Sequence, residues 1–106
     1  MTQTLIKMPK TARAGEVIEV LATIAHPMDS GYKPGANGQL IPRNILRSFT
    51  CHYDGVQVFE AQLFPAISSN PFVSFHLRAT RSGPVQLNWR GDFGFAHTET
   101  LQLQVT

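Results

Sequence analysis

The sequence predicts an all-β protein, an immunoglobulin-like antiparallel β-sandwich of about seven strands formed as a single domain by residues 1–106. Three observations predict this class. Short segments in which apolar and polar residues alternate recur along the chain, and turn residues separate them at intervals of roughly 8–12 residues. Helical spacing is weak throughout; residues 41–49 allow a single turn at most, because Pro42 stands near their start. An Asp-Gly pair at residues 54–55 lies between two alternating segments and favours a tight hairpin turn.

The first two strands are expected before residue 27. Residues 4–8 form the first strand, which Pro9 ends, and residues 12–15 form the turn that follows. Residues 16–26 are β-branched and almost continuously apolar. This pattern is typical of a strand that is covered on both faces.

The next two strands form the predicted hairpin. Residues 48–53 alternate, which places Phe49, Cys51 and Tyr53 on one face. The Asp-Gly pair follows, and the strand pattern resumes at residues 56–59. A type I′ turn needs positive φ at both central residues, and this dipeptide tolerates that conformation.

The second half of the chain continues the alternation. A loop is expected over residues 63–71, and turns are expected over residues 82–84 and 91–94. The inward positions of its three strands are Val73, Phe75, Leu77 and Ala79, then Val85, Leu87 and Trp89, then Leu101, Leu103 and Val105.

A polar, glycine-rich segment at residues 30–39 interrupts this pattern. Irregular excursions of this length in compact domains are usually functional or disordered. The residues that flank this one are apolar and aromatic, with nearby arginines, a composition found at protein interfaces. We therefore expect the functional edge over residues 26–47 and predict partner contacts at Met28, Ile41, Pro42, Arg43 and Arg47, with a further contact at Phe93.

The prediction for Phe93 has an alternative. This ring stands in a predicted turn, where it is wet unless another surface covers it. Either it belongs to an interface, or Phe93 and Phe95 together cap the open end of the sandwich.

Composition excludes several classes of function. Charged residues make up only 15% of the 106 residues, and nine Lys and Arg against seven acids give a net charge of +2 without a basic stripe. Nucleic acid binding is therefore not expected. No apolar run has the length of a membrane span, so membrane insertion is not expected either.

Catalytic and metal chemistry also lack a sequence signal. The single cysteine, Cys51, shares its predicted face with aromatic residues, which favours burial over reactivity, and the neighbouring His52 points to the opposite face. The four histidines are each about a strand apart, without the close pairing typical of zinc ligands. We expect no catalytic residue, no metal site and no cofactor.

Several short motifs in a fixed order connect this chain with a known family. They are HPM at residues 26–28 followed by an acidic residue and Gly31, IPR-x-I at residues 41–45, and FTC-x-x-x-G at residues 49–55. With these motifs the sequence resembles the SoxZ family, the small subunits of the SoxYZ carrier of bacterial thiosulfate oxidation. The resemblance extends from the Ala-Gly-Glu at residues 14–16 to the strands of Phe75 and Trp89. The insert at residues 31–38 varies in that family, so its residues receive no role.

The resemblance implies a partner chain and a cellular compartment. The partner is a SoxY-like chain that bears the substrate on a C-terminal cysteine, and the pathway enzymes make transient contacts with the complex. SoxZ proteins typically lack an export signal and reach the periplasm with their partner. The N-terminal segment here has no apolar h-region, so we expect periplasmic localisation by co-export. Arg43 and Arg47 become candidates for attracting anionic sulfur groups, because guanidinium binds oxyanions in a bidentate fork.

Two other functions stay open on the sequence alone. The first is a self-associating immunoglobulin-like accessory module that uses the same apolar surface to form a homodimer. The second is an enzyme in which Cys51 is the nucleophile, which rapid labelling of the folded protein by iodoacetamide would favour.

Overall fold

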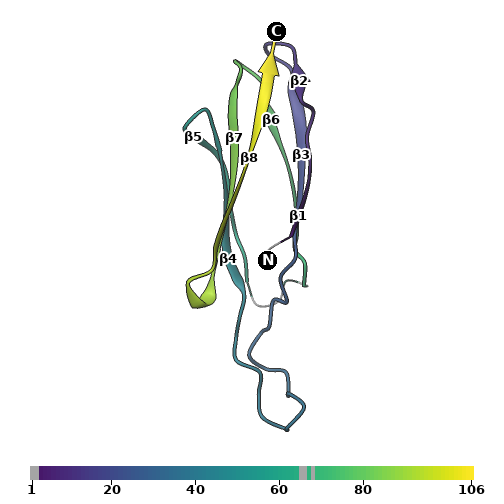
Figure 1. Ribbon diagram of the computed structural model, residues 1–106, viewed down its shortest axis with the longest axis vertical. Helices are drawn as coiled ribbons and strands as arrows, with labels where there is room; N and C mark the ends of the chain where they lie inside the picture. Colours follow the sequence, from purple (N-terminus) through teal and green to yellow (C-terminus); the bar gives the residue numbers. More distant parts are fainter. Residues whose placement is uncertain (1–2, 65–66, 68) are drawn as a thin grey trace.

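Eight strands form two sheets that face each other in the computed structural model, which describes residues 3–64, 67 and 69–106 (Figure 1). The three-stranded sheet has the order β1 (Thr4–Lys7), β3 (Val17–Ile24), β6 (Phe72–Arg78). The five-stranded sheet has the order β2 (Thr11–Ala12), β8 (Ala96–Val105), β7 (Gly83–Gly91), β4 (Leu46–Tyr53), β5 (Val56–Gln62). The predicted all-β sandwich is therefore confirmed.

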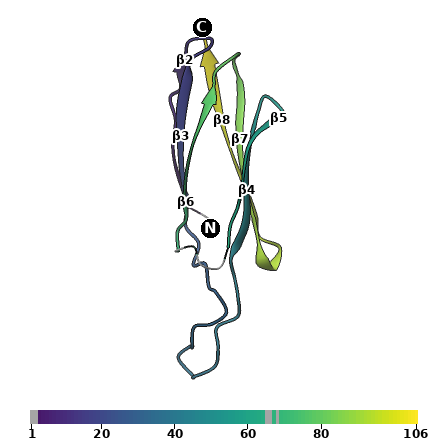
Figure 2. The same ribbon diagram turned by 180° about the vertical axis from the view of Figure 1, so that it is seen from behind.

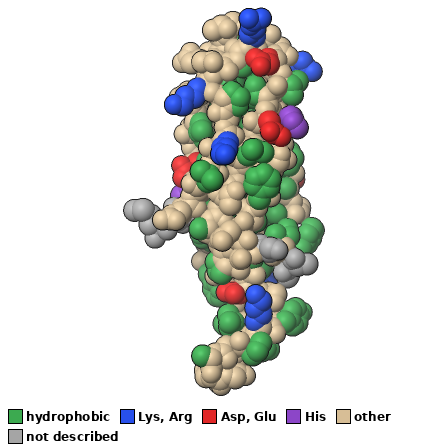
Figure 3. Space-filling model, turned by 90° about the vertical axis from the view of Figure 1, so that its right-hand side faces the viewer, with side chains coloured by type: hydrophobic (Ala, Val, Ile, Leu, Met, Phe, Trp, Pro, Cys, Tyr) green, Lys and Arg blue, Asp and Glu red, His purple; other side chains and the backbone are tan. Residues whose placement is uncertain are grey.

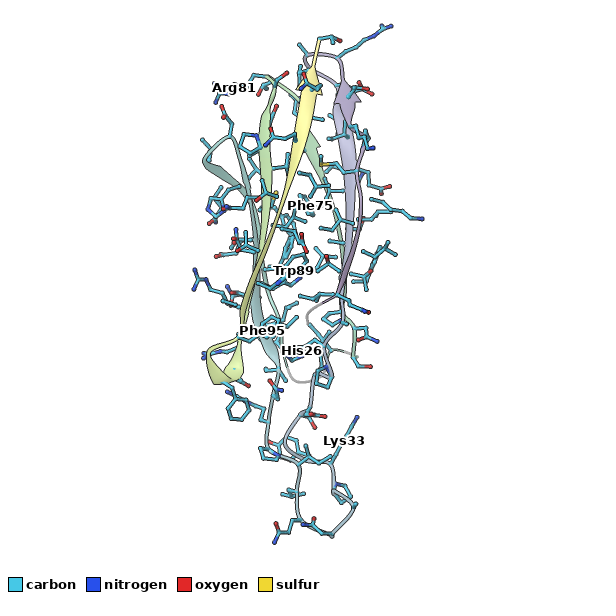
Figure 4. All side chains as sticks on the ribbon, in the orientation of Figure 1. His26, Lys33, Phe75, Arg81, Trp89 and Phe95 are labelled. Carbon is cyan, nitrogen blue, oxygen red and sulfur yellow. The ribbon has the colours of Figure 1, made fainter. Side chains whose placement is uncertain are left out.

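The core lies between the two sheets and is built from the inward positions of the alternating strands. Val73, Val85, Leu87, Trp89 and Leu103 are all buried, as their place in the alternation predicts. The side chains of Phe75 and Trp89 project into the space between the sheets (Figure 4). Strands β3 and β4, whose relation the sequence leaves open, lie in different sheets.

An aromatic cluster forms the centre of this core. The ring of Phe49 lies 5.1 Å from that of Trp89 and 5.8 Å from that of Phe75, measured between centroids. The ring of Phe59 stacks on Phe75 at 4.5 Å. Phe59 thus extends the core toward strand β5 and is not available as an exposed contact residue.

The predicted hairpin is confirmed. Asp54 and Gly55 have φ angles of 50° and 84°, both in the left-handed region that a type I′ turn requires. Strands β4 and β5 pair antiparallel on either side of this turn, although the register shifts between Cys51 and His52. Both strands are longer than the sequence predicts.

The prediction that residues 16–26 form a strand covered on both faces is wrong. In β3, buried residues alternate with exposed or half-buried ones, and Val17 and Glu19 are exposed. The physical reason is that a sandwich covers each sheet on one side only, so the outward residues of β3 meet solvent or neighbours within the sheet.

One further feature differs from the sequence prediction, whereas the turn predicted at residues 91–94 is confirmed. Strand β2 pairs with β8 in parallel, in a ladder of two residue pairs that the sequence does not announce. The turn after β7 contains a single 3-10 turn, η1 (Asp92–Gly94). The predicted loop at 63–71 includes residues 65, 66 and 68, which lie outside the described residues.

The molecule is elongated because residues 25–45, between β3 and β4, extend beyond one end of the sheets (Figure 2). Its principal extents are 57, 23 and 19 Å. The C-terminus lies at the opposite end (Figure 1). None of the described residues forms a helix with the length and apolarity needed to span a membrane. Residues 25–45 are called the finger below.

Candidate functional site

The finger is an irregular hairpin and not a structureless loop. Asp29 and Asn44 exchange two backbone hydrogen bonds, each 2.8 Å long, near its base. Further out, the amide of Ile41 donates to the carbonyl oxygen of Lys33 at 2.8 Å. The side chain of Lys33 projects from this outer part (Figure 4). The polar excursion therefore has a defined backbone path that presents its side chains away from the sandwich.

Met28 belongs to the core, so its predicted position on the contact surface needs correction. Only 3% of its surface is exposed, and its sulfur accepts a hydrogen bond from the amide of Leu46 at 3.2 Å. The residue has a φ angle of 53°. This left-handed backbone turns the thioether inward and joins the finger to the start of β4.

His26 fastens the other side of the finger base. Its amide donates to Oδ1 of Asn70 at 3.0 Å, and its carbonyl accepts from the amide of Asn70 at 2.7 Å. Its Nδ1 accepts from the amide of Met28 at 3.1 Å. The imidazole packs edge-on against Phe95, where the finger leaves the sandwich (Figure 4). His26 is therefore a buried structural residue, and its position in the sequence does not predict this role.

An ion pair ties the finger to η1. Nε of Arg43 and its terminal nitrogen donate to the two carboxylate oxygens of Asp92, each at 3.0 Å. The same carboxylate accepts from the amide of Ile45 at 3.2 Å. The two residues are 49 positions apart, so the sequence, in which Asp92 stands within the turn predicted at residues 91–94, gives no signal for this contact.

The pKa of Asp92 reflects these contacts. Partial desolvation raises it, but the Ile45 amide and the Arg43 guanidinium, helped by the charge of Arg47, lower it further than desolvation raises it. The pKa therefore lies below its ordinary value, and Asp92 is a carboxylate at neutral pH. The bidentate fork of Arg43 is engaged by this carboxylate, so Arg43 is a positioning residue for the finger.

Three of the nine exposed large hydrophobic residues in the described part of the chain lie on the finger and η1, and two of them are the most exposed of the nine. Tyr32 and Leu40, on the finger, are 82% and 62% exposed, and Phe93 in η1 is 77% exposed. Ile41 is half-buried, while Pro42 and Arg47 are exposed. The face in Figure 3 has hydrophobic side chains on the finger, whereas most of its charged side chains lie toward the opposite end.

Phe93 and Phe95, for which the sequence leaves two alternatives, differ in their burial. Phe95 is half-buried and packs against the core, so it caps the end of the sandwich. Phe93 has a φ angle of 58° and projects its ring outward. Phe93 therefore stays a predicted contact residue.

Cys51 is fully buried between the sheets. Desolvation raises the pKa of its thiol to about 11, so the thiol is protonated at neutral pH. A protonated, inaccessible thiol is a poor nucleophile and cannot hold a mobile substrate. Among the described residues, no group of three or more His, Cys, Asp or Glu side chains is placed to hold a metal ion.

The contacts of His26 predict that acid loosens the finger base. Burial lowers the pKa of His26, and the charges of Asp29 and Asp92 offset only part of that effect. The folded pKa lies below the 6.5 of an unfolded histidine, so stability from this group is present above pH 6.5 and falls as pH drops through the folded pKa. Protonation would also convert Nδ1 from an acceptor to a donor facing the Met28 amide.

The measurement is the midpoint of urea unfolding between pH 7.5 and 5. We expect His26→Asn, which keeps an acceptor near Nδ1, to lower the midpoint at pH 7.5 and to flatten its decline with acid. His76→Asn is the matched control because His76 is exposed. An identical decline in wild type and His26→Asn would exclude a contribution of His26.

Together, the fold and the finger define an immunoglobulin-like β-sandwich protein that presents apolar side chains on a fastened hairpin. A family model described as sulphur oxidation protein SoxZ matches residues 6–102, nearly the whole chain. The chain therefore belongs to the SoxZ family and is a subunit of a Sox sulfur-oxidation system. Among curated proteins, none matches this sequence.

Solved structures with the same fold include two kinds of protein. A putative superoxide reductase from Thermotoga maritima has a TM-score of 0.75 at 14% identity, over 97% of this chain and 85% of that one. The superoxide reductase (neelaredoxin) from Ignicoccus hospitalis has a TM-score of 0.73 at 16% identity, over 99% and 82%. The sulfur carrier protein SoxY from Chlorobium limicola has a TM-score of 0.68 at 16% identity, over 97% and 78%. At these identities the likeness shows the fold alone.

Proposed function

We propose that this chain is the non-catalytic subunit of a carrier complex in which a SoxY-like chain bears the substrate on a C-terminal cysteine during thiosulfate oxidation. The observation that carries the proposal is the set of exposed apolar residues Tyr32, Leu40 and Phe93 at one end of a chain that belongs to the SoxZ family. Exposed aromatic residues on a held backbone favour binding, because little conformational entropy is lost when they are covered.

Two observations support the non-catalytic role. The only cysteine is buried, with its pKa raised to about 11, so the carried group needs a thiol from another chain. The finger is fastened by the Arg43–Asp92 ion pair and by the backbone bonds of Asp29 and Asn44, which suits a preformed docking surface. The pathway enzymes would contact the assembled pair transiently. We further propose that the pair is exported to the periplasm together, on the signal of the partner.

The test of the pairing is co-expression with a SoxY-like chain, followed by size-exclusion chromatography with light scattering. A one-to-one complex at the summed mass supports the proposal. A chain that elutes alone at its own mass, or as a homodimer beside the unbound partner, refutes it.

The contact surface is tested by polar substitutions on the finger and η1. We expect the variant Tyr32→Ser/Phe93→Asn to weaken the affinity for the partner about tenfold or more, because exposed aromatic anchors dominate many interfaces. Asparagine tolerates the left-handed backbone of position 93, so the fold should persist.

The matched control is Phe72→Ser, which removes an aromatic ring that is 61% exposed and lies on the three-stranded sheet. Isothermal titration calorimetry measures both affinities. If Phe72→Ser weakens binding and the finger variant does not, the partner docks on the outer face of that sheet instead.

Self-association remains a second candidate because the larger sheet has an edge strand with exposed apolar residues. Strand β5 is an edge strand of the larger sheet, and Val56 and Val58 on it are exposed. Open, apolar edge strands can pair with a second copy. Light scattering of the isolated chain distinguishes this candidate: a stable homodimer that persists when a SoxY-like chain is added favours it.

A further inference from the structure

A shallow hollow of about 310 Å³ lies on the outer face of the five-stranded sheet, beside the finger base. Its lining is polar and comes from three neighbouring strands, β5, β4 and β7. The lining residues are Arg47, Ser48, Glu60, Gln62, Arg90 and Gly91. This surface is continuous with the finger, because Gly91 precedes η1 and Arg47 lies near the start of β4.

Strand pairing explains why these residues meet. Ser48 on β4 lies opposite Arg90 on β7 and opposite Gln62 on β5. Between Leu46 and Ser48 the register shifts, which leaves Arg47 as the extra residue of a bulge. The carbonyl of Arg47 accepts a hydrogen bond from the amide of Leu63 at 2.9 Å, which holds the bulge in place. Arg47 and Arg90 therefore line one hollow although 43 positions separate them in the sequence.

The two arginines in the hollow differ from three other arginines of the chain in their contacts. Arg43 and Arg81 form ion pairs with Asp92 and Asp54, and the guanidinium of Arg78 donates to a backbone carbonyl. By contrast, the guanidinium groups of Arg47 and Arg90 make no ion pair or hydrogen bond with any described residue. Glu60 is the one acid in the lining, so the two arginines leave a net positive charge.

We propose that this hollow binds a small oxyanion, and that in the carrier complex its ligand is the sulfonate-type terminus of a sulfur group. Guanidinium matches the geometry of such anions with paired N–H donors, and the Ser48 hydroxyl and Gln62 amide add neutral donors. An anion between Arg47 and Arg90 also relieves the repulsion of two like charges. The identity of the anion as a sulfur compound rests on the proposed function; the anion site itself rests on the side chains.

The hollow differs from the anion site that the sequence predicts. The sequence pairs Arg43 with Arg47, but the fork of Arg43 is engaged by Asp92. Arg90 replaces it as the second cation. A sulfur group carried on a mobile arm of the partner would be held beside the finger, where the proposed docking surface lies.

The test is a titration of the full-length, isotopically labelled chain, followed by nuclear magnetic resonance at constant ionic strength. The probes are sodium thiosulfate, sodium sulfate and a short peptide that ends in S-sulfocysteine, with sodium chloride as the reference. We expect saturable shifts at the side-chain signals of Arg47 and Arg90 and at the amides of Ser48 and Gly91. The double variant Arg47→Gln/Arg90→Gln should weaken the apparent affinity about fivefold or more, as loss of charge-assisted hydrogen bonds requires.

The matched control is Arg13→Gln, which should leave the titration unchanged because this exposed arginine lines a different hollow, together with Ala12 and Thr106. Shifts that chloride reproduces, or that survive the double variant, overturn the proposal. Equal affinity for thiosulfate and the peptide supports a site for free anions, whereas tighter binding of the peptide supports a site for a carried group. If no anion binds, the proposed pairing with a SoxY-like chain is still tested by co-expression. If no pairing occurs, the anion titration still tests the hollow, so the two proposals can be refuted separately.

Discussion

Replacement of Phe49 by alanine is expected to lower the free energy of unfolding by about 4 kcal/mol. The side chain is fully buried, and its ring contacts those of Phe59, Phe75 and Trp89. Truncation removes apolar burial and leaves a cavity whose aromatic walls cannot collapse fully, because they belong to two sheets.

Urea unfolding followed by tryptophan fluorescence measures this effect, since Trp89 adjoins the cavity. In a domain of this size the loss corresponds to a fall of roughly 15–30 °C in Tm. Phe72→Ala is the matched control: that ring is 61% exposed, and its removal should change the free energy by less than about 0.5 kcal/mol. Equal losses for the two variants would mean that the aromatic cluster does not form the centre of the core.

The inward faces of the strands were readable from the sequence because side chains alternate with a period of two. Val85, Leu87 and Trp89 are separated by polar residues, so one of the two faces had to be the buried one. The Asp-Gly hairpin was equally readable, because its backbone requirement is local.

What the sequence could not provide depends on contacts between distant segments. The ion pair of Arg43 and Asp92 and the shared hollow of Arg47 and Arg90 both require knowledge of strand order and register. No local sequence pattern predicts the ion pair or the hollow, because β4 pairs with β7 although β5 and β6 lie between them in the sequence.

The misplacement of Met28 has a related cause. From the sequence alone, an apolar residue at the start of a polar segment can be an interface residue or a core residue. Its contacts in the fold decide between the two: Met28 is buried, and its sulfur accepts a hydrogen bond from the amide of Leu46. The interruption of the strand pattern at residues 30–39 was evident from the sequence, whereas the direction of individual side chains around it was not predictable.

The finger base is a compact set of mutually dependent contacts. Asp92 accepts from Arg43 and Ile45, while its own amide donates to the carbonyl of Ile45 at 2.9 Å. One carboxylate thus joins the finger, η1 and the end of β7. A change that separates β7 from the start of β4 should therefore disturb the docking surface and the anion hollow together.

Gly91→Ala is expected to make this separation and to cost about 2–3 kcal/mol of unfolding free energy. A Cβ at this position would lie 2.6 Å from the carbonyl oxygen of Ile45 and 3.1 Å from Cα of Leu46, both of them backbone atoms. The strands must move apart to admit it, which should lengthen the hydrogen bond between the Asp92 amide and Ile45. Urea unfolding measures the cost, and amide hydrogen exchange at Ile45 and Asp92 locates it.

Gly83→Ala is the matched control for this effect, because neither glycine has a left-handed φ angle and both lie in β7. A Cβ at position 83 would have its nearest contacts with the side chain of Asp54, the closest at 3.1 Å, and a shift of a few tenths of an ångström relieves them. We expect a cost below about 1 kcal/mol, with unchanged exchange at the finger base. Affinity for the SoxY-like partner should fall in Gly91→Ala and persist in Gly83→Ala. If both variants bind equally well while Gly91→Ala shows accelerated exchange at Ile45 and Asp92, partner binding does not depend on the contacts of the finger base.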